Sequence, residues 1–215
     1  MQFIIADDHP LFRTAITHTL QQHFDGAQVL EVGSLQELLK LLKTGVDADL
    51  LLLDLHIPDA HGFNGLAQVS ELFPDIPVMI VSGNDNPSVI HKSVALGASG
   101  FLPKSTSNED MAVAINCVMQ GHVWIPANLP AITMSLDNEQ TAQRIAALTP
   151  QQLKVLTMMG DGLYNKQIAS ELSVTDATVR AHVTEVFRKL GVTNRTQAGI
   201  FFNRLKVEDP HCQVM

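Results

Sequence analysis

The sequence predicts an α/β protein, a doubly wound parallel five-stranded sheet, followed by a small all-α domain. Over the first 124 residues, five short apolar runs alternate with five helical patterns, which is typical of successive βαβ units. From residue 148 to residue 206 the apolar residues recur at helical spacing, without strand-like alternation. The length of 215 residues suits one large or two small domains.

The expected strands are short and almost wholly apolar, as strands covered on both faces should be. They are residues 3–6, 29–32, 50–53, 78–81 and 100–102. Amphipathic stretches between them predict five helices, with Ser34 as the N-cap of the second, over residues 11–20, 35–42, 63–73, 88–96 and 109–120.

The second part of the chain begins after a segment of small and polar residues. Pro126 and Pro130 interrupt regular structure there, so residues 125–147 are predicted to be a linker, with a short helix near residues 139–147. Thr149-Pro150-Gln151-Gln152 combines a capping threonine with a glutamine three residues later, a capping box. We therefore expect domains at 1–124 and 148–206, with a tail at 207–215.

The composition excludes several classes of protein. With 46% hydrophobic and 17% charged residues, the chain can build a core and is not intrinsically disordered. Its apolar runs are too short to span a bilayer, and no signal peptide is visible. The two cysteines, Cys117 and Cys212, do not have metal-ligand spacing, which favours a reducing cytoplasm as the location.

Charge is distributed unequally between the two parts. Residues 1–124 contain 5 Lys and Arg against 14 Asp and Glu, a net charge of −9, whereas residues 148–206 contain 8 against 4, a net charge of +4. An acidic part can hold cations and a basic part can hold phosphates, so different partners are expected.

Polar residues stand where the predicted strands end. Asp7 and Asp8 follow the first strand, Asp54 follows the third, Ser82 follows the fourth, and Lys104 lies just past the fifth. Ligands of open parallel sheets bind beyond the carboxyl ends of the strands, so these side chains should share one pocket. Clustered carboxylates need a hard cation such as Mg²⁺, and a carboxylate can attack phosphorus to form an aspartyl phosphate.

These residues stand in a recognisable pattern. The first 124 residues resemble the receiver domain of bacterial response regulators through Asp7-Asp8, Asp54-Leu55-His56-Ile57-Pro58 with Gly62, Ser82-Gly83, and Gly97-Ala98-Ser99-Gly100-Phe101-Leu102-Pro103-Lys104. The resemblance implies a flavodoxin-like sheet and a sensor histidine kinase as the phosphate source.

The same resemblance implies a role for each residue of the pocket. Asp54 would be the phosphate acceptor, and Asp8, Asp54 and the backbone carbonyl of His56 would ligate Mg²⁺, with Asp7 helping through water. Lys104 would contact the phosphoryl group. Ser82 and Phe101 match the hydroxyl and aromatic switch positions, although Phe101 lacks the hydroxyl of the commoner tyrosine. His9 is expected only to shape the turn before Pro10.

Residues 165–190 predict two helices joined by a short turn, with Thr175 capping the second. One face of the second helix is apolar, and Arg180, Thr184 and Arg188 are spaced four apart on the opposite face. A solvated polar face explains such a helix equally well, but a helix that packs on one side and enters a major groove on the other has the same pattern.

The whole segment resembles the LuxR-type helix-turn-helix domain. The matching motifs are Leu148-Thr149-Pro150, Asn165-Lys166-Gln167-Ile168-Ala169, Thr178-Val179-Arg180, His182-Val183, and Lys189-Leu190-Gly191-Val192 through Asn194-Arg195-Thr196. The resemblance implies base contacts by Arg180 and Thr184, with Val179 as an apolar contact and Thr178 beside it. It implies phosphate contacts by Lys166, Arg188, Asn194 and Arg195. Thr184 replaces a residue that is often basic in this family.

Together the two resemblances imply a response regulator of the NarL/FixJ type. Phosphorylation would favour a homodimer or release the second domain, and so change binding to double-stranded promoter DNA; RNA polymerase remains open as a further partner. A phosphatase of the haloacid dehalogenase type is an alternative, although His56 stands where it would need an acid. A receiver that works without phosphate is the other alternative.

Overall fold

The computed structural model describes residues 1–60, 62–126, 144–145 and 147–208. The chain divides into two compact units, an α/β unit that contains residues 1–119 and returns at Val123, and a helical unit that contains the last four helices. None of the described helices is long and apolar enough to cross a membrane. Most of the predicted helix near residues 139–147 lies outside the described residues.

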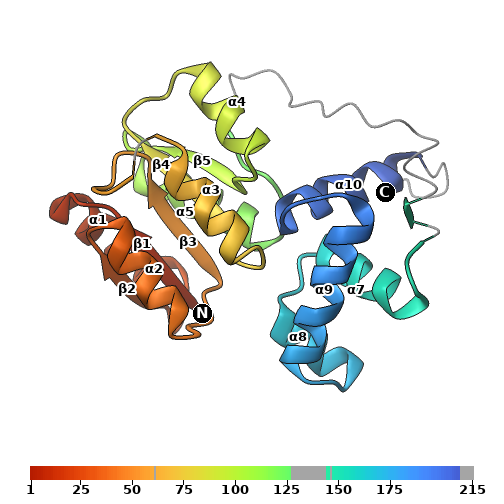
Figure 1. Cartoon of the computed structure of the whole chain (residues 1–215). Coiled ribbons are helices and arrows are strands. Elements are labelled where there is room, and N and C mark those ends of the chain that lie inside the picture. Colours follow the sequence, from red (N-terminus) through yellow and green to blue (C-terminus); the bar gives the residue numbers. More distant parts are fainter. Residues whose placement is uncertain (61, 127–143, 146, 209–215) are drawn as a thin grey trace. The chain divides into compact units, whose positions relative to one another are not determined.

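The α/β unit has one sheet of five parallel strands in the order β2-β1-β3-β4-β5 (Figure 1). This confirms the predicted fold class, and all five predicted strands are present. The strands are β1 (Gln2–Ala6), β2 (Gln28–Val32), β3 (Leu50–Asp54), β4 (Val78–Ser82) and β5 (Gly100–Pro103).

Five helices cover the two faces of this sheet. Alternate residues of the strands pack against α2, α3 and α4 in one apolar cluster, while α1 packs against α5. The Ser34 side chain accepts the Glu37 N–H, which confirms the predicted N-cap of α2. The helices are α1 (Pro10–His23), α2 (Leu35–Lys43), α3 (Asn64–Leu72), α4 (Pro87–Ala95) and α5 (Asn108–Met119).

The helical unit surrounds a second, separate apolar cluster to which all four of its helices contribute. The capping box predicted at Thr149 and Gln152 is present, with both hydrogen bonds formed. The Thr175 side chain accepts the Thr178 N–H, as predicted for the start of the second helix of the pair. The helices are α7 (Pro150–Gly160), α8 (Asn165–Leu172), α9 (Asp176–Leu190) and α10 (Arg195–Glu208).

The segment after α5 adds a short pairing to the edge of β5. The Phe101 N–H donates to the Trp124 carbonyl at 3.0 Å, and the Trp124 N–H donates to the Ser99 carbonyl at 3.2 Å. Ile125 packs against the apolar cluster of the α/β unit. The chain from Trp124 to Ile125 is therefore part of this unit, although the sequence placed Ile125 in the linker.

Candidate phosphoacceptor pocket and DNA-contacting helix

The strand order brings the predicted polar residues together at the carboxyl edge of the sheet. Asp54 ends β3 and Asp7 directly follows β1, the adjacent strand. Because the chain turns to opposite sides of the sheet from β1 and β3, a crevice opens between these strand ends. Oxygen atoms of Asp7, Asp8 and Asp54 and a ring nitrogen of His9 all lie within 4.8 Å of one another.

Lys104 bridges the two buried carboxylates of this pocket. Its Nζ lies 2.7 Å from Asp7 Oδ2 and 2.9 Å from Asp54 Oδ2, and its side chain is 19% exposed. Burial lowers the pKa of Lys104, but the hydrogen bonds and negative charges of Asp7 and Asp54 outweigh burial and raise it above the usual 10.5. Lys104 is therefore a permanent cation at physiological pH, beside the predicted phosphate acceptor.

Asp54 is held rigidly although it lies at the end of a strand. All five residues of β3 are buried, and Asp54 itself is 2% exposed. Its Oδ1 accepts the His56 N–H at 3.1 Å, while its Oδ2 accepts a hydrogen bond from Lys104. The two oxygens are thus distinguished by their partners, and the carboxylate is fixed in one orientation.

The carboxylates of the pocket fit a hard divalent cation. Three carboxylate groups from one small crevice provide the oxygen ligands that Mg²⁺ prefers. Asp7 Oδ2 is buried, and the Lys104 ammonium 2.7 Å away compensates its charge. Asp8 is exposed, which leaves positions for water or a phosphoryl oxygen around a bound ion.

His9 is a member of this pocket that the sequence prediction missed. Its Nδ1 lies 2.9 Å from Asp7 Oδ1, 2.7 Å from Asp8 Oδ1 and 3.3 Å from Lys104 Nζ. The prediction assigned it only to the turn before α1, where it is indeed the N-cap residue. Its position directly after Asp7-Asp8 was the available signal.

The two predicted switch residues are both fully buried. Ser82 Oγ accepts the Asn84 N–H at 3.1 Å. The Phe101 ring lies in the apolar cluster with residues of α2, α3 and α4, and therefore already occupies an inward position. If Phe101 acts as an aromatic switch that rotates inward after phosphorylation, its ring must first occupy a position other than this one.

The outer face of α9 carries the predicted DNA contacts, but each arginine is paired with an acid. Arg180 Nε lies 2.7 Å from Asp176 Oδ2, and Arg188 Nη2 lies 2.8 Å from Glu185 Oε2. The arginine side chains are 41% and 67% exposed. The hydrogen bond and charge of Arg188 lower the pKa of Glu185, so that carboxylate remains ionised at neutral pH.

The structure separates the remaining predicted DNA contacts into exposed and internal ones. Lys166 is exposed on α8, Thr184 is exposed on α9, and Thr178 is half-buried near the start of α9. Val179 is fully buried in the apolar cluster. The expectation that Val179 offers an apolar contact to DNA is therefore corrected, because its side chain points toward the core.

Asn194 and Arg195 both make contacts within the helical unit. Asn194 is buried, and its Oδ1 accepts the Gln197 N–H at the start of α10. The Arg195 guanidinium donates to the carbonyls of Met159 and Leu163 near the end of α7. Both side chains therefore hold helix ends in place, a role that the sequence motif did not reveal.

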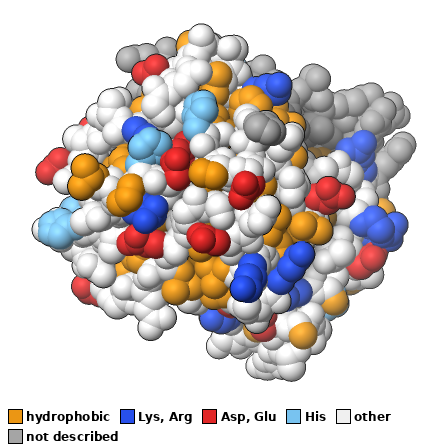
Figure 2. Space-filling model, turned by 60° about the vertical axis from the view of Figure 1, so that its left-hand side comes forward, with side chains coloured by type: hydrophobic (Ala, Val, Ile, Leu, Met, Phe, Trp, Pro, Cys, Tyr) orange, Lys and Arg blue, Asp and Glu red, His pale blue; other side chains and the backbone are white. Residues whose placement is uncertain are grey.

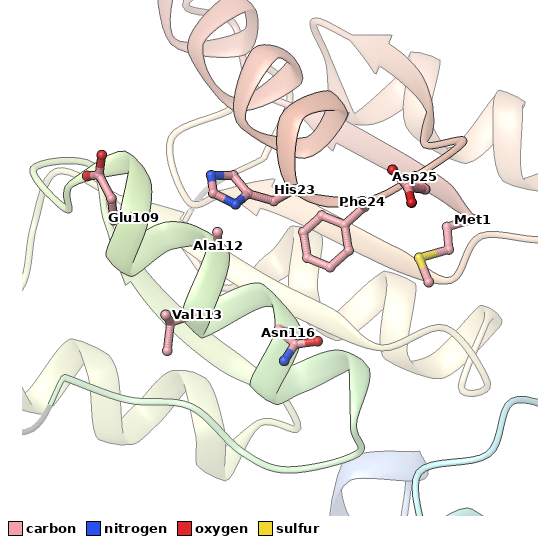
Figure 3. Close-up of a pocket in the computed structure, with 8 residues that line it drawn as sticks. All are labelled: Met1, His23, Phe24, Asp25, Glu109, Ala112, Val113 and Asn116. Atoms are coloured by element: carbon pink, nitrogen blue, oxygen red, sulfur yellow. The ribbon is translucent and has the colours of Figure 1, made fainter.

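A further pocket of about 740 Å³ lies outside these predicted residues. Figure 3 shows its lining side chains, which come from the N-terminus, the end of α1 and the α5 helix. Val113 contributes an apolar side chain that is 64% exposed. None of the lining residues is among those predicted to be functional. The pocket is lined by Met1, His23, Phe24, Asp25, Glu109, Ala112, Val113 and Asn116.

Known proteins resemble the chain over nearly its whole length. It matches the response regulator receiver domain family over residues 3–116 and the bacterial regulatory proteins, luxR family, over residues 146–202. It is 39% identical over 204 residues to the glycerol metabolism activator of Pseudomonas putida, with 92% of each chain covered. It is 28% identical to the nitrate/nitrite response regulator protein NarL of Escherichia coli, with 95% of each chain covered.

Solved structures show the same fold. The RcsB response regulator of Salmonella typhimurium has a TM-score of 0.56 at 23% identity, with 95% of this chain and 98% of that chain covered. The non-phosphorylated receiver domain of RcsB from Escherichia coli has a TM-score of 0.54 at 26% identity, covering 59% of this chain and 98% of that chain. The chain belongs to the two-component response regulators that join a receiver domain to a LuxR-type DNA-binding domain, a family of transcription regulators and not of enzymes.

Proposed function

We propose that Asp54 accepts a phosphoryl group from a sensor histidine kinase and that the phosphorylated chain controls transcription from promoter DNA. The single observation that carries this proposal is Asp54, buried at a strand end, with the Lys104 ammonium 2.9 Å from its Oδ2. A carboxylate oxygen attacks phosphorus, the bond from phosphorus to the histidine nitrogen breaks, and the nitrogen keeps the electron pair. The product is an acyl phosphate on Asp54.

The chain's own residues provide the charge and the hydrogen bonds for this transfer. Lys104 is positioned to neutralise a phosphoryl oxygen, and the Ser82 hydroxyl can donate to another once it turns from the Asn84 N–H that it now accepts. Asp8, Asp54 and the carbonyl of His56 would ligate Mg²⁺, with Asp7 acting through water. When bound, Mg²⁺ neutralises phosphoryl charge and orients the group for in-line displacement.

A physical route from the pocket to the output begins at Phe101. Its side chain occupies the core beside α4, and its backbone N–H donates to the carbonyl of Trp124, where the chain leaves the receiver. A change in the β5 backbone near Lys104 would therefore alter the start of the linker. We propose that this change favours a homodimer or releases the helical domain, which requires that the phosphoryl group bind the two states unequally.

The proposed DNA contact is the outer face of α9. Arg180 and Thr184 would face base edges, while Lys166 and Arg188 would contact phosphates. The RcsB structures include dimers bound to DNA, and a dimer would place two such helices on adjacent half-sites. Asn194 and Arg195 would contribute through the position of α10, since their side chains already serve internal contacts.

Acetyl phosphate with Mg²⁺ tests the acceptor. Intact-mass spectrometry should find one added phosphoryl group on the wild type and none on Asp54→Ala, and promoter binding should increase only for the wild type. If Asp54→Ala still gains the group, the acceptor is another residue. If Asp54→Ala leaves DNA binding and target expression unchanged, the receiver works without phosphate.

Arg180→Ala tests base recognition. Loss of a good bidentate base contact should cost about 1–3 kcal/mol at the preferred site and relax sequence preference. Genome-wide mapping of bound DNA identifies that site, and competition with unrelated DNA then measures the ratio of specific to non-specific affinity. An unchanged ratio would remove Arg180 from the set of base-reading residues.

A further inference from the structure

His9 places a nitrogen atom among the carboxylates of the receiver pocket. Its Nδ1 lies 2.7 Å from Asp8 Oδ1 and 2.9 Å from Asp7 Oδ1, and 3.8 Å from Asp54 Oδ2. With metal–ligand bonds of about 2.1 Å, adjacent ligands of an octahedral ion are about 3.0 Å apart and opposite ones about 4.2 Å. The separation from Asp8, a proposed direct ligand, is close to that of adjacent ligands, and the separation from Asp54, another proposed direct ligand, is intermediate between the two.

The position of this imidazole is prepared by the backbone. His9 is the N-cap of α1, and Pro10 follows it at the first helical position, where the proline ring restricts the backbone. The His9 N–H also donates to Asp7 Oδ1 at 2.7 Å. The His9 ring is thus oriented by a local hydrogen-bonded turn, which lowers the entropic cost of bringing its nitrogen to an ion.

The other imidazole beside Asp54 is placed differently. His56 Nδ1 is 3.9 Å from Asp54 Oδ1, and it is not part of the set of donor atoms that lie within 4.8 Å of one another. His9 shares that set with two carboxylates of its own loop and with Asp54 from β3. Of these two histidines, His9 has the geometry of a ligand.

We propose that His9 Nδ1 is a direct ligand of the divalent cation in this pocket and shifts its preference from Mg²⁺ toward first-row transition ions. The inference rests on the proposed function, because it assumes the cation site of a working receiver. Carboxylate and water ligands alone suit Mg²⁺, whereas imidazole nitrogen binds later divalent ions of the first row more strongly. A pocket of mixed oxygen and nitrogen donors therefore favours Co²⁺ over Mg²⁺ more than an oxygen-only pocket does.

The test compares metals in the full-length protein and in His9→Gln. Glutamine can offer an oxygen donor in place of the nitrogen, so Mg²⁺ affinity should fall much less than Co²⁺ affinity. Loss of even an outer-shell partner of a metal ligand weakens metal binding by about 10- to 100-fold, so loss of a direct nitrogen ligand should weaken Co²⁺ binding by at least about tenfold. Isothermal titration with Co²⁺ and Mg²⁺ measures both, and His18→Gln, an exposed histidine of α1, is the matched control.

Pulsed electron paramagnetic resonance of the Mn²⁺-loaded protein gives a direct readout of the ligand. An imidazole nitrogen bound to Mn²⁺ modulates the electron spin echo; the modulation should be present in the wild type and His18→Gln and absent in His9→Gln. Loss of the signal in His56→Gln alone, its presence in His9→Gln, or an equal loss of Co²⁺ and Mg²⁺ affinity in His9→Gln would each overturn the proposal.

The two proposals can fail separately. Phosphorylation of Asp54 by acetyl phosphate in Mg²⁺ without a nitrogen signal would overturn only the role of His9. A nitrogen signal in a protein that acetyl phosphate does not phosphorylate would support His9 as a ligand and overturn the proposed phosphoacceptor. Thermal unfolding of His9→Gln without metal, at the wild-type midpoint, shows that the variant is folded.

Discussion

Lys104 determines the electrostatic balance of the receiver pocket. Asp7 and Asp54 are almost completely buried, and two buried carboxylates this close would repel each other strongly without a cation. Lys104 contacts both, and its Nζ also lies 4.9 Å from the centre of the Phe12 ring. The lysine therefore stabilises the unphosphorylated pocket as well as being positioned for the phosphoryl group.

Lys104→Met should consequently destabilise the receiver in metal-free buffer. Hydrogen bonds to charged groups contribute about 1.5–3 kcal/mol each, and a cost in this range is expected at pH 7. Because the folded pKa of Lys104 is raised above 10.5, its contribution is complete below that pH and is lost as pH rises through the folded pKa. Urea unfolding at several pH values measures the gap between wild type and variant; a gap that stays constant at high pH contradicts this account.

We expect Glu185 to weaken DNA binding. Its carboxylate is held by Arg188 on the proposed DNA face, so it would repel phosphates and keep Arg188 from contacting them. Glu185→Gln should tighten DNA binding and make the salt dependence steeper by about one unit of slope if Arg188 gains a phosphate. Fluorescence anisotropy across a salt series measures both, with Glu109→Gln in α5 as the equal-charge control. Weaker or unchanged binding would show that α9 meets DNA by another face.

The edge of β5 is the element that joins the switch region to the linker. Residues 99 and 101 exchange backbone hydrogen bonds with Trp124, and Gly100 lies directly between them. A Cβ atom at Gly100 would lie 2.9 Å from Met79 Cε, 3.0 Å from the Trp124 carbonyl oxygen and 3.1 Å from Val118 Cγ2. Glycine is needed here because another backbone segment passes this close to the strand.

Gly100→Ala should therefore loosen the pairing at Trp124. Crowding a packed site costs about 1–3 kcal/mol, and Trp124 is the only tryptophan of the chain, so its fluorescence reports the displacement. Gly83→Ala is the matched control, since a Cβ there meets nothing within 4 Å. Unchanged stability and emission in Gly100→Ala would mean that the strand edge adapts without moving the linker.

The two units of the molecule have separate cores, and we propose a different ligand for each. The acidic cluster belongs to the receiver, and the apolar cluster of the helical unit is independent of it. Both acidic and basic side chains are exposed on the face drawn in Figure 2. Because the chain's net charge is −8, we expect DNA affinity to depend on the local charge of α8 and α9.

Mg²⁺ should accordingly stabilise only one of the two units. A ligand at 100 times its dissociation constant stabilises the folded state by about 2.7 kcal/mol. In differential scanning calorimetry, one transition should move to higher temperature with Mg²⁺ and the other should stay in place. Asp8→Asn, which removes a proposed ligand charge, should reduce the shift. Two transitions that move together would mean that the domains unfold as one cooperative unit.

The order of the elements, the starts of several helices and the residues at the strand ends could be predicted from the sequence. It could do so because the apolar spacing and the caps at Ser34, Thr149 and Thr175 are local properties of the chain. It also placed Asp7, Asp54 and Lys104 in one pocket, since parallel strands bring their carboxyl ends to one edge.

Contacts between distant residues could not be predicted by those rules, because they depend on how the whole chain packs. His9 contacts Lys104 across 95 positions of the chain, and Arg195 reaches carbonyls more than 30 positions away. Val179 belongs to the same motif as Arg180, yet one is buried in the core and the other is partly exposed. Side-chain direction depends on the packing of distant elements, and that information is absent from the spacing of residues along a single helix or strand.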